Sequence, residues 1–243
     1  MPPVVEHAAF PATRWSMVAR ASHDDERAHV ALGELCTRYW APLYAFVRHQ
    51  GRSASDAEDL VQGFVAEVLN TKGLARADQQ RGRFRNYLLG AFRHYLSKQS
   101  RRERTQKRGG GQAPRPLDFE GADGLVELPV AGPHDPEAAY ARTWAMATLR
   151  RAMSLVAREY EERGLRPIFD ALEPSLLNGE TPPYREIAER QDMNEGAVRV
   201  AAHRLRTRFR QMLRDEVADT LVEGADVGAE LRALMDALRP SEP

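Results

Sequence analysis

The 243-residue sequence has a single cysteine, Cys36, so it cannot form an internal disulfide or a metal site made of several cysteines. We expect Cys36 to act as a small buried apolar residue. The sequence also lacks any stretch that approaches the roughly 20 apolar residues needed to span a membrane. Its first residues, MPPVVEHAAFPATRW, lack the basic-then-apolar order of a secretory signal, and we therefore expect a cytoplasmic protein.

Sequence features of common enzyme sites are absent as well. The 7 histidines show no close His-His or His-Cys ligand spacing, no glycine-rich phosphate loop occurs, and the GGG at 109–111 simply follows a basic run. Paired carboxylates such as Asp24 and Asp25 fit a solvated surface. A nuclease is therefore the weaker hypothesis, and we expect no enzymatic activity, no cofactor and no bound metal.

Charge is balanced overall but segregated along the chain. The sequence has 35 Lys and Arg against 35 Asp and Glu, which gives a formal net charge of zero. Residues 81–108 and 199–214 are basic, with Glu103 as their one acid, whereas residues 118–137 and the tail after 214 are predominantly acidic. Two basic segments separated by acidic ones indicate two contacts with a polyanion.

Apolar residues recur at spacings of three and four and nowhere alternate for long, which predicts an all-α fold. We expect a long helix at 25–49, which Pro42 should kink or interrupt. The next helix, at 55–70, begins with Ser55 and Glu58 in the spacing of a capping box. Further helices are expected at 15–21, 84–102, 136–163, 167–177, 184–190, 194–213 and 227–238.

The segment at residues 109–136 is acidic, rich in Gly and Pro and without helical periodicity, so we interpret it as a flexible linker. This linker predicts two small helical domains, residues 1–108 and 137–214, followed by an acidic helical tail at 215–243. Two interpretations of the tail stay open. It either packs near the basic segment at 199–214 and limits DNA binding, or it extends the second domain.

The second basic segment fits a helix-turn-helix. TPPYREIAERQDMNEGAVRVAAHRLRTRFRQML places a helix at 184–190, a turn, and a second helix that Asn194 can cap. Apolar residues follow one face of this second helix and cations the other, as in a recognition helix that meets base edges and phosphates. The cations are Arg199, His203, Arg206 and Arg210. The alternative is a merely solvated helix, which the lack of interleaved acids disfavours.

Two stretches resemble a known protein family. YREIAERQDMNEGAVRVAAHRLRTRFRQML resembles the C-terminal DNA-binding region of extracytoplasmic-function (ECF) sigma factors, and RYWAPLYAFVRHQGRSASDAEDLVQGFVAEVLN resembles their N-terminal region. The resemblance covers residues 35–108 and 140–214, in the family's order and with a linker between them. It implies a bacterial transcription initiation subunit that joins core RNA polymerase and directs it to promoter DNA.

The resemblance also implies roles for individual residues. The helix DAEDLVQGFVAEVL resembles the one that docks on polymerase, and its candidate contacts are Asp56, Asp59, Gln62 and Glu67. The following basic segment resembles the element that reads and melts the downstream promoter element. Its candidates are Arg83, Arg85, Tyr87, Arg93, His94, Lys98, Arg101 and Arg102. The upstream element would be read by base contacts from Arg199, His203 and Arg204, with Arg206 and Arg210 beside them.

Several alternatives remain at these positions. Aromatic residues in the first basic segment either stack on unpaired bases or belong to the core; Phe84 and Phe92 fit the core, whereas Tyr87 and His94 are open. Gly63 stands where the family commonly has an acid, which implies either close packing or an altered docking contact. Acids that begin the docking helix would also stabilise any helix N-terminus.

The partners implied by the resemblance are core RNA polymerase and promoter DNA. An anti-sigma factor is a further partner that the sequence does not identify, and the linker is either a tether or part of the polymerase's nucleic-acid path. The rival function is a helix-turn-helix regulator that works without polymerase. That function would leave the docking-like helix and the first basic segment without a role.

Overall fold

The computed structural model describes residues 26–70, 83–106, 135–177, 183–222 and 224–239. This part of the chain is 85% helical and has no strand, so the all-α prediction is confirmed. Its helices are α2 (Glu26–Arg48), α3 (Ala54–Asn70), α4 (Phe84–Gln106), α5 (Pro136–Glu162), α6 (Arg166–Leu172), α7 (Pro174–Leu177), α8 (Tyr184–Arg190), α9 (Glu195–Ala218) and α10 (Val227–Leu238). The helix expected at 15–21 and the linker as far as residue 134 lie outside the described residues.

The first hydrophobic cluster gathers the apolar faces of α2, α3 and α4. Apolar residues three and four apart on α2 are buried in this cluster, at Leu32, Leu35, Tyr39, Leu43 and Phe46. On α4, Phe84, Leu88 and Phe92 stand four residues apart and are fully buried. The interpretation of Phe84 and Phe92 as core residues is therefore confirmed.

Pro42 does not end α2, which continues to Arg48; of the two outcomes expected at this proline, a kink or an interruption, the interruption does not occur. Proline inside a helix removes one backbone hydrogen bond and costs about 3 kcal/mol. The apolar residues on both sides of Pro42, Tyr39 and Phe46, are buried in the same cluster. Burying one such side chain contributes roughly 1.5–3 kcal/mol, so packing on both sides of the proline outweighs its cost.

The start of α3 also differs from the prediction. Its cap is Ser53, whose Oγ accepts a hydrogen bond from the backbone N–H of Asp56 at 3.1 Å. The capping box proposed for Ser55 and Glu58 is therefore wrong, because the sequence has the same serine-to-acid spacing two residues earlier. The helix itself, Ala54–Asn70, agrees with the prediction.

The ends of α5 agree with the sequence-based prediction. Asp135 precedes the helix, and its Oδ1 accepts a hydrogen bond from Glu137 N at 2.8 Å. Pro136 takes the first helical position, where its missing N–H costs nothing. At the other end Gly164 adopts φ +68°, a left-handed conformation that glycine tolerates and that stops the helix.

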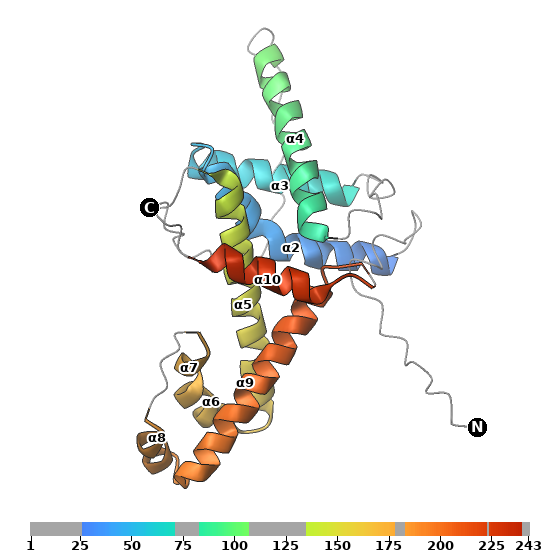
Figure 1. The fold of residues 1–243 in the computed structure, drawn as a ribbon. Helices are drawn as coiled ribbons and strands as arrows, with labels where there is room; N and C mark the ends of the chain where they lie inside the picture. Colours follow the sequence, from blue (N-terminus) through green and yellow to red (C-terminus); the bar gives the residue numbers. More distant parts are fainter. Residues whose placement is uncertain (1–25, 71–82, 107–134, 178–182, 223, 240–243) are drawn as a thin grey trace, which may run out of the picture.

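The long helices α5 and α9 take part in two hydrophobic clusters. Val156 and Leu205 belong to the second cluster, with α6 and α8, whereas Trp144 and Val217 belong to the first. Figure 1 shows both helices running from one cluster toward the other. The first cluster thus contains residues from both sides of the expected linker. The division into domains at 1–108 and 137–214 stays a prediction.

The helix expected in the acidic tail is present as α10. It packs against α5 and the end of α9, and Leu234 is fully buried in the first cluster. Met235, the next residue on α10, is exposed. Beside α10, the start of α4 is tied to the segment after α9 by a hydrogen bond from Phe84 N to Thr220 O at 3.0 Å.

Close packing accounts for Gly63 on α3. A Cβ atom at this position would lie 2.4 Å from the Tyr95 hydroxyl oxygen and 3.5 Å from Tyr95 Cζ. The Tyr95 ring is buried on α4 and contacts the rings of Phe64 and Phe92, so it has little room to move. Of the two explanations that the sequence left open, the structure gives the first.

We expect Gly63→Ala to lower the free energy of unfolding by about 1–3 kcal/mol, because the added methyl group overlaps the Tyr95 hydroxyl. In a Tyr95→Phe background the same change should instead stabilise the protein by up to about 1 kcal/mol, because alanine favours helix and the overlap is gone. Urea denaturation of the single and double variants measures both effects. Gly90→Ala on α4, where a Cβ meets nothing within 4 Å, is the control and should stabilise. Equal destabilisation in both backgrounds would contradict the packing explanation.

Candidate nucleic-acid interface

Helices α8 and α9 are joined by a short turn at residues 191–194. Asp192 in this turn has φ 50°, a left-handed conformation that aspartate tolerates better than most residues. Asn194 caps α9 as expected, with its Oδ1 accepting a hydrogen bond from Ala197 N at 2.7 Å. Ile187 of α8 and Val198 of α9 are both buried in the second cluster, which fixes the angle between the two helices.

The cap fixes where α9 begins, and we expect Asn194→Ala to destabilise the protein by about 1 kcal/mol. The N–H of Ala197 would lose its partner and the first turn of α9 would fray. Thermal or urea unfolding measures the loss. Asn194→Asp is the matched control, because its carboxylate keeps the acceptor; a loss of stability as large as that of alanine would contradict the capping role.

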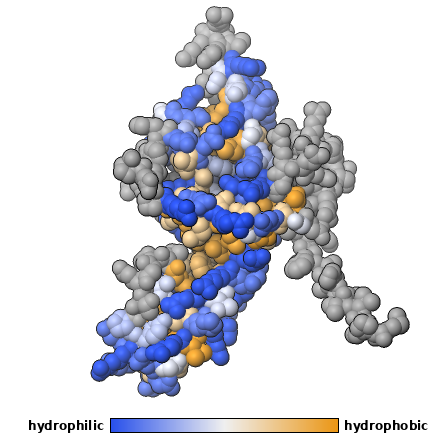
Figure 2. Space-filling model, viewed as in Figure 1, coloured by the Kyte–Doolittle hydropathy of each residue, from blue (hydrophilic) through white to orange (hydrophobic). Residues whose placement is uncertain are grey.

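Most cations predicted on α9 face solvent. Arg199, His203, Arg204 and Arg210 are exposed. Within the described part of the chain, no carboxylate forms an ion pair with Arg204 or Arg210. Arg199 pairs with Glu195 at 3.0 Å, and both side chains are exposed, so this pair adds at most about 0.5 kcal/mol and leaves the guanidinium accessible. In Figure 2 the surface along α9 is largely hydrophilic.

Arg206 and Arg208 differ from these exposed cations. Arg206 is half-buried and donates to the Tyr184 hydroxyl at 3.3 Å. Arg208 Nε donates to Glu159 Oε2 at 2.6 Å, and its Nη2 donates to the other oxygen of the same carboxylate. These hydrogen bonds lower the pKa of Glu159 below its ordinary value. Arg208 therefore holds α9 against α5. The predicted cations of α9 that are exposed are Arg199, His203, Arg204 and Arg210.

At the start of α4, Arg83 and Arg85 are held by the acidic tail. Glu230 of α10 is 0% exposed; its Oε2 lies 3.1 Å from Arg83 Nε and its Oε1 accepts from Arg85 Nε at 2.5 Å. The Arg85 guanidinium also lies over the Trp144 ring, 4.6 Å from its centroid. The Arg85 carbonyl accepts a hydrogen bond from the Tyr140 hydroxyl at 3.1 Å. Two of the predicted DNA contacts are thus engaged with other parts of the protein.

The middle of α4 presents a mixed surface. Arg93 pairs with Glu137 at the start of α5, and its guanidinium lies 5.7 Å from the centroid of the Phe46 ring. His94 is exposed. Tyr87 is half-buried, and burial raises the pKa of its hydroxyl. Of the two aromatic side chains that the sequence left open, His94 is the more accessible.

The far half of α4 projects beyond the other described helices (Figure 1). Arg101 and Arg102 on this half are exposed. Lys98 Nζ lies 2.9 Å from Glu67 Oε1 on α3, so a residue predicted to bind DNA pairs with one predicted to bind polymerase. Both side chains are partly exposed, and a pair of this kind contributes at most about 1 kcal/mol.

The other candidates for polymerase binding lie along α3. Asp56 and Asp59 are exposed, and Gln62 is half-buried. Asp56 lies in the first turn, where a carboxylate also stabilises the positive end of the helix dipole. The structure therefore places two carboxylates of α3 on an accessible surface.

The acidic tail was predicted either to pack near the basic segment of α9 or to extend the second domain. Its acids have other partners in the described part of the chain. Glu230 pairs with Arg83 and Arg85, and Asp226 with Arg232. The tail thus contacts the first basic segment, and none of the tail's described ion pairs involves an exposed cation of α9.

The chain was compared with protein-family models, with curated proteins and with solved structures, and none of them matches it. Among the described residues, no group of three His, Cys, Asp or Glu side chains could hold a metal ion. The described helices include none with the length and apolar character needed to cross a membrane.

Cys36 is buried in the first cluster, as expected for a small apolar residue. Burial raises the pKa of its thiol to about 12. At neutral pH the group is therefore protonated and unreactive as a nucleophile. This observation removes the one thiol of the chain from the candidate site.

Proposed function

We propose that the protein is a bacterial sigma factor of the ECF type. Its α8–α9 pair would act as a helix-turn-helix that binds the upstream promoter element, and α3 and α4 would provide the contacts with polymerase and the downstream element. The observation that carries the proposal is the row of exposed cations on α9, beginning in the first turns after the Asn194 cap. In recognition helices, side chains of these first turns contact base edges, and cations further along the helix bind phosphates.

The chemistry of the exposed side chains on α9 suits a major groove. Arg199 can form two hydrogen bonds to guanine, a contact worth roughly 1–3 kcal/mol of discrimination against the wrong base. Val200, the next residue, is 50% exposed, and its side chain suits contact with a thymine methyl group. Arg204 and Arg210 lie further along the helix and would bind phosphates on the duplex backbone.

On α4 the accessible side chains for promoter melting lie in the middle and the far half. His94 can stack on an unpaired base, which contributes about 1–3 kcal/mol, and Arg101 and Arg102 would hold the separated strand. Arg83 and Arg85 would reach DNA only after leaving Glu230. The proposal therefore assigns the downstream contact mainly to residues beyond Arg93.

Run-off transcription tests the function directly. Purified bacterial core RNA polymerase is given a genomic fragment library with and without the protein, and the RNA starts are sequenced. A sigma factor produces new starts that share two spaced upstream motifs. If the protein binds DNA but yields no new start, the polymerase-independent regulator replaces the proposal.

We expect the double variant Asp56→Ala, Asp59→Ala to lose at least about tenfold in affinity for core polymerase while its DNA affinity is unchanged. Both carboxylates are exposed on α3. An exposed contact of this kind at a protein interface contributes roughly 1 kcal/mol to binding, so two contacts are expected to contribute at least a factor of ten. Co-purification and fluorescence titration with labelled core enzyme measure the loss. Asp170→Ala on α6, also an exposed acid, is the control. Unchanged polymerase affinity in the double variant would remove α3 as the docking helix.

A further inference from the structure

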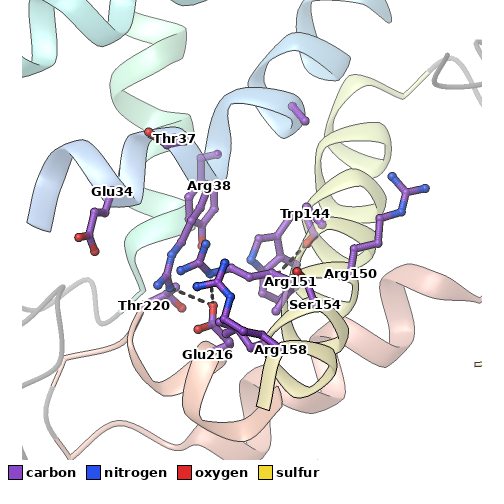
Figure 3. A pocket seen from close by; sticks show the side chains of 15 residues that line it. Glu34, Thr37, Arg38, Trp144, Arg150, Arg151, Ser154, Arg158, Glu216 and Thr220 are labelled. Atoms are coloured by element: carbon purple, nitrogen blue, oxygen red, sulfur yellow. Dashed lines mark hydrogen bonds and ion pairs between the residues drawn. The ribbon is translucent and has the colours of Figure 1, made fainter. Parts of the chain in front are cut away.

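A cleft of about 650 Å³ lies between α2, α5 and the end of α9, where its lining residue Glu216 follows Arg210 along the helix (Figure 3). Its volume is in the range of small-molecule sites, roughly 300–1,000 Å³. The lining is rich in cations and hydroxyl groups. These residues are Arg38, Arg150, Arg151, Arg158, Thr37, Thr148, Ser154 and Thr220. The acids in the lining are Glu34 and Glu216, so the cleft has a net positive charge.

Two of the arginines are oriented by one buried carboxylate. Arg151 Nε donates to Glu216 Oε2 at 2.6 Å, and Arg38 Nη1 lies 3.3 Å from the same oxygen. The Glu216 side chain is only 9% exposed, so it is held firmly between them. Asp219 adds a longer contact of 3.7 Å to Arg38 Nη2. Arg38 and Arg151 therefore have a structural role, since both pair with Glu216 near the end of α9.

Arg158 lines the same cleft but has no such structural ion pair in the ranges that the structure describes. In Figure 3 Arg38, Arg151 and Arg158 converge on the region of Glu216, whereas Arg150 extends away from them. Within the described residues no carboxylate forms an ion pair with Arg158, an exposed residue that also lines the cleft. Ser154 lies between Arg151 and Arg158 on the same face of α5, and its hydroxyl has no hydrogen-bond partner in the described part of the chain.

We propose that this cleft binds a small phosphate-bearing ligand through Arg38, Arg151, Arg158 and the Ser154 hydroxyl. Guanidinium groups that are already oriented can donate paired hydrogen bonds to phosphate oxygens, and a serine hydroxyl is a further donor. A ligand with at least two negative charges would balance the positive lining. Because the cleft is lined by α2, α5 and the end of α9 together, the ligand would bridge these three helices.

Isothermal titration of the full chain with inorganic pyrophosphate tests the proposal. We expect Arg158→Ala to weaken binding by about tenfold or more and Ser154→Ala by roughly threefold, as for a charged and a neutral hydrogen bond. Arg142→Ala is the matched control, since it removes an exposed arginine of α5 outside the cleft and should leave the dissociation constant unchanged. Far-UV circular dichroism verifies that each variant stays folded.

Three results would overturn the proposal. The first is an absence of pyrophosphate binding by the wild-type chain at millimolar concentration, and the second is binding that Arg158→Ala leaves unchanged. The third is displacement of pyrophosphate by duplex DNA, which would make the cleft part of the DNA-binding surface. Retained pyrophosphate affinity in an Arg199→Ala, Arg210→Ala variant separates this site from the cations of α9, so failure here leaves the proposed sigma function intact.

Discussion

Replacing Glu230 by alanine should lower the free energy of unfolding by about 3–5 kcal/mol, the cost of breaking a buried ion pair from one side. Glu230 is 0% exposed and is the shared partner of Arg83 and Arg85. Without it the Arg85 guanidinium, whose side chain is 15% exposed, stays in a largely dry position beside a second positive charge. The lost carboxylate would also leave a cavity between α10 and the start of α4.

Urea denaturation followed by circular dichroism measures this loss. Asp236→Ala is the control on the same helix, because Asp236 pairs with Arg239 at 3.3 Å on an exposed surface, where such a pair contributes less than about 1 kcal/mol. Glu230→Gln should fall between the two, since it keeps the shape and one acceptor but loses the charge. If Glu230→Ala cost no more than Asp236→Ala, the tail would not be holding α4.

The helices and their buried faces could be predicted because they depend on patterns between residues that are close in sequence. The four-residue spacing of Phe84, Leu88 and Phe92 is a property of the chain within α4, and it predicts the buried side without knowledge of what covers it. The same is true of the Asn194 cap, which needs only the N–H of Ala197. At Pro42 packing on both sides keeps the helix continuous, so the expected interruption does not occur, and at the start of α3 Ser53 takes the capping position expected for Ser55.

The parts that could not be predicted depend on contacts between distant segments. Glu230 and Arg85 are 145 residues apart in sequence, and no periodicity relates them. Charge segregation indicated that acidic and basic segments could meet, but it did not identify the ion pairs: Glu230 of the tail pairs with Arg83 and Arg85 at the start of α4, while α10 packs against α5 and α9. The spacing of Arg151, Ser154 and Arg158 could have suggested a basic face on α5, but not that Arg38 of α2 lies opposite.

For the proposed DNA contact, we expect the triple variant Arg199→Ala, Arg204→Ala, Arg210→Ala to lose about 100-fold or more in affinity for duplex DNA at moderate salt. Each side chain is exposed on α9, and each lost contact with a base or phosphate costs roughly 1 kcal/mol or more. The salt dependence should also change. The slope of log affinity against log salt concentration becomes shallower by roughly 1 for each phosphate contact removed.

Fluorescence anisotropy with a labelled duplex at several salt concentrations measures both quantities. The matched control is Arg142→Ala, Arg232→Ala, Arg239→Ala, which removes the same charge from exposed positions on α5, on α10 and just after α10. Long-range electrostatics alone would weaken DNA binding equally in both triple variants, because the net charge changes by the same amount. A direct contact weakens it only where the α9 cations are lost, so equal losses would show that α9 does not lie against DNA.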